Sequence, residues 1–140
     1  MRISYLTVAA LALLAFDASA QKACETNYVQ EGSFFAGRKF TTWEVVPVAP
    51  AQAFKRIKIE GVKSGLTLKT SDEESGLLMF EQNAQGSKGQ VTLPWNVLIE
   101  PEGKTSSKIT VTKLTPGGYA TSEKFQREST CGVIQAASTK

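Results

Sequence analysis

The sequence of 140 residues contains no histidine. This absence excludes the Ser-His-Asp triad, histidine-ligated zinc and the H-E-x-x-H arrangement. Asp72 is the only aspartate after residue 20, and the G-x-S-x-G nucleophile motif does not occur. We therefore expect no catalytic residue, no metal ligand and no cofactor, and we predict that the protein is not an enzyme.

Long hydrophobic runs are also scarce, and the one that exists lies at the start of the chain. Residues 5–16 form an apolar run, and Ala18 and Ala20 fit the A-x-A cleavage pattern. A run of about a dozen residues is shorter than the roughly 20 that a spanning helix needs, so we expect no stable membrane insertion. We predict a signal peptide over residues 1–20 and a single domain over residues 21–140.

Cysteine is limited to Cys24 and Cys131. An even pair in an exported protein favours a disulfide, which would stabilise the fold by on the order of 4–5 kcal/mol in the chain-entropy model. A redox pair usually has C-x-x-C spacing, and two cysteines without histidine make a poor metal site. A lipid anchor on Cys24 is disfavoured, because Gln21 stands where a lipoprotein signal would place an apolar residue. We expect a periplasmic or secreted protein.

Charge of one sign does not dominate, since 16 Lys and Arg face 13 Asp and Glu. A net charge of +3 without interleaved aromatics does not indicate a nucleic-acid binder. The acidic run at residues 72–74 is typical of a solvated turn, although a calcium site is the functional alternative. A local basic excess could contact an acidic partner or form the outer face of a helix; it comprises Lys55, Arg56, Lys58 and Lys63.

The elements that the sequence does contain are short strands and one clear helix. Ala53, Phe54, Ile57 and Gly61 recur at helical spacing after Pro50, which predicts an amphipathic helix of about 12 residues. Gly61 is unfavourable within a helix by about 1 kcal/mol relative to Ala. Alternating and β-branched residues predict strands over 38–46, 66–70, 77–83, 91–100 and 107–114.

This order predicts an α+β fold with an antiparallel sheet of about five strands and the main helix packed on one face. A second, short helix over residues 121–127 is also compatible with the pattern. Pro94 cannot donate to a strand ladder, so we expect a sheet edge or a bulge there. We interpret residues 21–37 as a lead-in segment and residues 84–90 as a loop. The small, polar tail from Gln135 is expected to fray.

Aromatic residues offer two kinds of candidate site. Phe34 and Phe35 stand in an otherwise polar segment, so they should dock on this domain or on a partner. The other aromatics could line a pocket for an apolar ligand between helix and sheet, or could simply form the core; they are Trp43, Phe54, Phe80 and Trp95.

A family resemblance extends over residues 53–81. An aromatic-led helix, Gly65, a short strand, Asp72, Gly76 and another strand follow one another there. This order resembles the helix-grip domains of the BamC or NlpB-like outer-membrane assembly lipoproteins. The resemblance implies an envelope protein that works through contacts rather than catalysis. The lipid-modified cysteine of that family is absent, and no functional residue is carried over.

We therefore expect a small exported envelope or secreted protein that binds an envelope or extracellular protein without catalysis. Its contacts would involve Phe34, Phe35 and the basic residues of the predicted helix. A secreted inhibitor or immunity-like protein falls within this class. The alternative is a carrier that holds a small apolar ligand or lipid between helix and sheet.

Overall fold

The structure, a computed structural model, describes residues 22–139. The predicted signal peptide at residues 1–20 lies outside the described residues. Among the described residues, none of the helices is both long enough and apolar enough to cross a membrane.

A six-stranded sheet forms one layer of the domain, and all of its neighbouring strands are antiparallel. The spatial order is β1-β2-β6-β5-β4-β3. The strands are β1 (Val29–Ser33), β2 (Gly37–Val46), β3 (Thr67–Asp72), β4 (Leu77–Gly86), β5 (Gly89–Pro101) and β6 (Ser107–Thr115).

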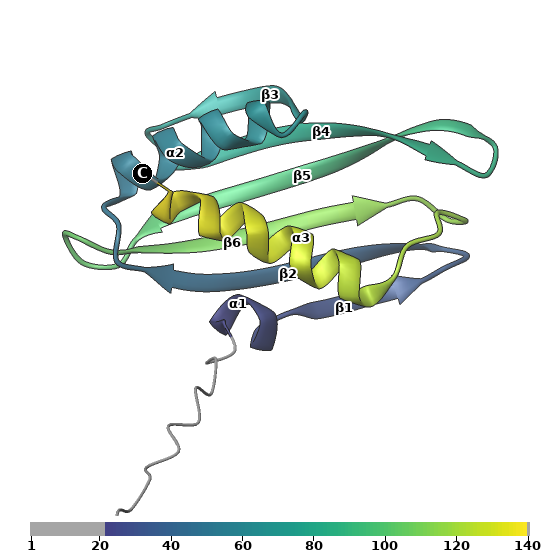
Figure 1. Ribbon diagram of the computed structural model, residues 1–140, viewed down its shortest axis with the longest axis horizontal. Coiled ribbons are helices and arrows are strands. Elements are labelled where there is room, and N and C mark those ends of the chain that lie inside the picture. The colour runs from purple at the N-terminus through teal and green to yellow at the C-terminus, as the bar shows by residue number, and fades with distance from the viewer. Residues whose placement is uncertain (1–21, 140) are drawn as a thin grey trace, which may run out of the picture.

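Two helices form the second layer, and both cover the same face of the sheet (Figure 1). Helix α2 (Pro50–Lys63) lies along the β3–β4 side, whereas α3 (Glu123–Gln135) crosses β6 and β2. A short helix, α1 (Ala23–Thr26), packs beside α3, and the 3₁₀ turn η1 (Ala136–Ser138) packs against α2. The fold is thus α+β, as the sequence predicted.

The core lies between the two layers and follows the predicted alternation. The inward side chains of β5 are Leu93, Trp95, Val97 and Ile99, and all of them are buried. Helix α2 buries the four residues that the helical spacing selected, which are Ala53, Phe54, Ile57 and Gly61.

Gly61 has a packing reason to interrupt the helix. A Cβ atom at this position would lie 2.7 Å from two carbons of the buried Phe80 ring. Real Cβ atoms do not approach so closely, so only glycine lets α2 settle onto β4 at this point.

Three details of the predicted sheet are wrong. The structure has six strands rather than about five, because β1 lies within the segment that we interpreted as a lead-in. All five β1 residues are exposed, so no inward apolar residue marks the strand in the sequence. Residues 84–90 are not a loop, because β4 continues to Gly86 and β5 begins at Gly89.

Pro94 lies in an interior strand, β5, at a point where that strand has a neighbour on one side only. Strand β5 pairs with β4 along almost its whole length, but its pairing with β6 begins only at Trp95. Pro94 therefore lies just outside the β5–β6 ladder, where a missing N–H costs little.

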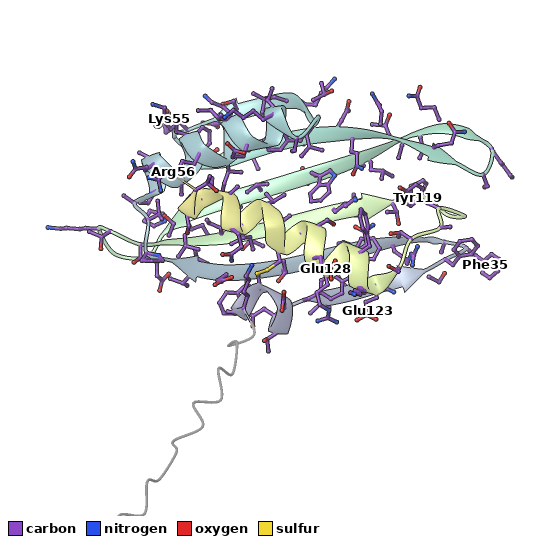
Figure 2. All side chains as sticks on the ribbon, viewed as in Figure 1. Phe35, Lys55, Arg56, Tyr119, Glu123 and Glu128 are labelled. Carbon is purple, nitrogen blue, oxygen red and sulfur yellow. A yellow bond between two sulfur atoms is a disulfide. The ribbon has the colours of Figure 1, made fainter. Side chains whose placement is uncertain are left out.

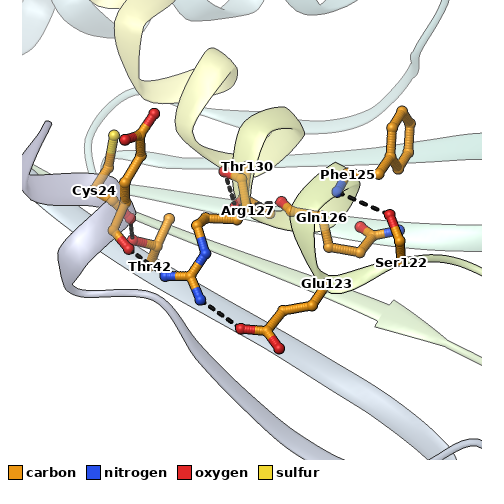
Figure 3. Close-up of polar contacts among 9 residues, drawn as sticks. Cys24, Thr42, Ser122, Glu123, Phe125, Gln126, Arg127 and Thr130 are labelled. Carbon is orange, nitrogen blue, oxygen red and sulfur yellow. Dashed lines mark hydrogen bonds and ion pairs between the residues drawn. The ribbon is translucent and has the colours of Figure 1, made fainter. Parts of the chain in front are cut away.

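The C-terminal helix is longer than predicted, and the tail after it is docked. Helix α3 runs to Gln135, with the Ser122 hydroxyl accepting a hydrogen bond from the Phe125 N–H at 3.1 Å (Figure 3). Ala137 is fully buried in η1, and the Arg56 guanidinium donates to its carbonyl at 2.9 Å. This contact explains why the small, polar tail does not fray.

A disulfide joins Cys24 of α1 to Cys131 of α3, as predicted. Helix α3 is also tied to the N-terminal turn by Arg127, which donates to the Glu25 carbonyl and pairs with Glu123 (Figure 3). The covalent bond and these polar contacts fix the position of α3 over the sheet.

Candidate functional site

A cavity of about 450 Å³ lies between α2, α3 and the inward face of the sheet. Its volume falls within the range of small-molecule sites, which span roughly 300–1,000 Å³. Phe80 and Trp95 supply aromatic walls from the sheet, and Ile57 and Leu66 add apolar surface. The cavity is the place where the two helices leave the inward face of the sheet incompletely covered.

Lys113 lies in the wall of this cavity and is 1% exposed. It projects inward from β6, between Phe40 of β2 and Trp95 of β5 in the strand register. Among the described residues, Lys113 has neither an ion-pair partner nor a hydrogen-bond partner. A buried lysine usually has such a partner, because an uncompensated charge is costly away from water.

Aromatic rings provide the contacts that Lys113 does make. Its Nζ lies 4.3 Å from the centroid of the Trp95 ring and 5.8 Å from that of Phe125. Burial lowers the pKa of the Lys113 ammonium to about 8. At neutral pH the group is therefore still mostly charged, with its positive end held against aromatic faces.

The alternation of β6 is what turns Lys113 inward. Ile109, Val111 and Lys113 share one face of the strand, because side chains two residues apart point to the same side. The strand predicted over residues 107–114 contains all three residues, but no inward position was predicted for Lys113. The signal that could have revealed the site is the charged Lys113 at the next inward position after Ile109 and Val111.

Small residues on α3 leave room for the cavity. Ser129 and Gly132 face it one turn apart, and no atom lies within 4 Å of a Cβ built on Gly132. Phe125 stands on the same side of the helix and is 53% exposed. Helix α3 thus places Cys131 and Ile134 in the core, while its cavity side combines Phe125 with the small residues Ser129 and Gly132.

Polar side chains also line this cavity, among them Ser64, Gln135 and Thr139. The Trp95 indole N–H donates to Gln82 Oε1 at 3.1 Å, which fixes both side chains in the wall. Glu60 also lines the cavity, and its carboxylate pairs with Lys63 at 3.4 Å. A wall that combines aromatic and aliphatic side chains with polar groups is typical of a site for a small organic molecule.

The predicted aromatic pocket is found in part. Phe80 and Trp95 line the cavity, whereas Phe54 belongs to the closed core at 3% exposed. Trp43 lies on the outer face of the sheet, where the Lys108 ammonium sits 4.9 Å from its ring centroid. Phe80 and Trp95 therefore belong to the core and line the cavity at the same time.

The predicted partner contacts do not form one surface. Phe34 and Phe35 occupy the β1–β2 turn, and Phe35 is 88% exposed. Lys55 and Arg56 lie near the opposite end of the long axis (Figure 2). Lys58 stacks its ammonium 5.7 Å from the Phe54 ring centroid, and Lys63 pairs with Glu60.

Comparisons with known proteins identify the fold but not a family. No family model matches the chain, and no curated protein matches it in sequence. The structure of Ara h 8.0201 is similar, with a TM-score of 0.51 and 15% identity over 73% of this chain and 95% of that one. A conserved protein of unknown function from Enterococcus faecalis has a TM-score of 0.50 and 7% identity over 81% and 75% of the two chains.

A norcoclaurine synthase from Thalictrum flavum aligns over 94% of both chains at 9% identity, but its TM-score of 0.46 is too low to support an argument. The similarities to the other two structures show a shared fold alone. None of them bears on the resemblance of residues 53–81 to the BamC or NlpB-like domains, which stays a prediction.

Proposed function

We propose that this protein binds a small, mainly apolar organic molecule in the cavity beneath α2 and α3. The observation that carries the proposal is the combination of a 450 Å³ cavity with an unpaired, buried Lys113 in its wall. A closed core would have an apolar residue at this position and a bulkier face on α3. The alternative of a ligand carrier, considered from the sequence, is therefore the better supported one.

The proposed role is binding rather than catalysis. Among the described residues, no carboxylate or other acid–base group pairs with Lys113 to assist proton transfer. Export to the periplasm or the exterior is part of the same proposal, and the disulfide between Cys24 and Cys131 supports it.

Binding of an envelope or extracellular protein stays a prediction. The exposed Phe34 and Phe35 favour it, because their rings lie together at the turn and form a small apolar patch that a partner could cover. Lys55 and Arg56 of α2 do not add to that contact, since they lie near the opposite end of the domain from Phe35 (Figure 2).

The cavity can be tested with N-phenyl-1-naphthylamine, an uncharged dye that becomes fluorescent in apolar surroundings. We expect saturable binding to the purified chain. Replacing Gly132 by Leu should weaken it by about tenfold, or about 1.4 kcal/mol, because the new side chain takes up space in the cavity wall that the dye would otherwise fill. The substitution also removes a helical glycine, so loss of fold does not explain a loss of binding.

Lys124→Leu is the matched control. It adds the same side chain to the same helix, at a position that is largely exposed and outside the cavity wall. Dye binding should survive this change. Equal affinity of the Gly132→Leu and wild-type chains would contradict the proposal, and so would the absence of saturable binding to the wild type.

A further inference from the structure

The buried ammonium of Lys113 points to the chemical class of the ligand. The side chain is taken almost completely out of water, and within the described part of the chain no acceptor compensates its charge. The Trp95 face, 4.3 Å away, offers only a partial substitute for lost hydration. Among residues 22–139 the ammonium therefore has no anionic partner, and the cavity beside it leaves room for one.

We infer that the cavity takes an amphipathic organic anion, with its carboxylate paired to Lys113 and its apolar part against Phe80 and Leu66. This inference rests on the proposed function and specifies its ligand. A carboxylate would accept hydrogen bonds from the Lys113 ammonium. Such bonds between charged groups are stronger where little water competes for them. A neutral apolar molecule would fill the same space and leave the ammonium unpaired.

The other charges around the cavity fit this arrangement. Among the described lining residues, Glu60 on α2 is the only one with a carboxylate, and it pairs with Lys63 at 3.4 Å. The lining residues of α3 carry no charge; they are Phe125, Ser129, Gly132, Val133 and Gln135. On the sheet, Gln82 and Trp95 are neutral and bonded to each other. Lys113 is thus the one group in the wall that would attract an anion.

Comparing the affinity for an acid with the affinity for an alcohol of similar shape separates recognition of the negative charge from burial of the apolar part. Decanoate and 1-decanol form one pair, and 1-naphthaleneacetate and 2-(1-naphthyl)ethanol form another, so that aliphatic and aromatic sources are both tested. At pH 7 we expect the wild-type chain to prefer at least one acid over its alcohol by about tenfold or more, measured by displacement of the uncharged dye. Lys113→Met should abolish the preference while the alcohol still binds.

The pH profile provides a second readout that does not depend on a variant. Both acids stay ionised above pH 6, so the affinity for the preferred acid should fall above pH 8 as the Lys113 ammonium loses its proton. Affinity for the alcohol should stay level over the same range.

The outcomes distinguish the two proposals. Equal binding of acid and alcohol by the wild type, sensitive to Gly132→Leu, would overturn the anion inference and leave the cavity as a binding site. Persistence of the preference in Lys113→Met would also overturn it. Failure of the dye, the acids and the alcohols to bind at all would remove the proposed function together with the inference.

Discussion

Ile109 and Val111 are surrounded very differently from Lys113, although all three side chains point inward from β6. The first two are fully buried in the apolar cluster that includes Ile99 and Val97. We call this set the sealed half of the inward face. Lys113, Trp95 and Gln82 form the open half, where a cavity takes the place of core side chains.

Polar atoms are distributed just as unevenly. Thr115 follows Lys113 on the inward side of β6, and its hydroxyl is buried without a hydrogen-bond partner. Gln126 Oε1 and the Tyr28 hydroxyl, in the elements near this end of the sheet, are in the same state. These three residues lie outside the cavity wall, so the cost that belongs to the open half itself is the burial of Lys113 without an ion-pair partner among the described residues. Such a local cost is expected at a binding site.

The largest test of this contrast replaces one residue in each half. Ile109→Ala should lower the free energy of unfolding by about 2–5 kcal/mol, because it leaves a void in a tightly packed cluster. Lys113→Met should leave stability unchanged or raise it by about 1 kcal/mol, since an apolar side chain of similar length replaces an unpaired cation. Urea unfolding of the disulfide-intact chains measures both. A loss in Lys113→Met as large as that in Ile109→Ala would contradict the contrast.

The second test uses pH. Because the pKa of Lys113 is lowered by burial to about 8, the unfolded chain holds more protons than the folded one between pH 8 and the ordinary lysine value of 10.5. Stability should therefore rise with pH in this window, by on the order of 1–3 kcal/mol.

The Lys113→Met chain is the control for the pH test, because its stability should not rise between pH 8 and 10. The comparison is best made below pH 10, since burial raises the pKa of Tyr28 to about 12 and this works in the opposite direction above pH 10. Parallel pH profiles of the two chains would contradict the assignment of the cost to Lys113.

The smallest test compares two helical glycines. Gly61→Ala should destabilise the fold by about 1 kcal/mol, because the clash with the Phe80 ring outweighs the gain in helix propensity. Gly132→Ala should stabilise it by about 0.5–1 kcal/mol, because its Cβ enters open space. Thermal unfolding of both variants checks the pair, and changes of the same sign would contradict the view that only α2 is tightly packed here.

The sequence was sufficient to predict the sealed half but not the open one. Alternation located five strands, and helical spacing selected the four buried residues of α2, because regular burial leaves a regular pattern. Strand β1 was not predicted, because none of its residues is buried and so no apolar alternation marks it in the sequence. The cavity depends on Ser129 and Gly132 of α3 lying opposite Lys113 of β6. In the sequence, residues as small as these two indicate neither a core position nor a surface position. Only the packing of α3 across β6 brings them together with Lys113.

The disulfide also closes most of the chain into a ring. From Cys24 to Cys131 the polypeptide and the sulfur bridge form a continuous covalent circuit, which includes every hairpin turn of the sheet. One proteolytic cut at any of these exposed turns would open the circuit without releasing a fragment. The helix that roofs the cavity would stay attached to the sheet after such a cut, so a single break in the chain need not remove a bound molecule.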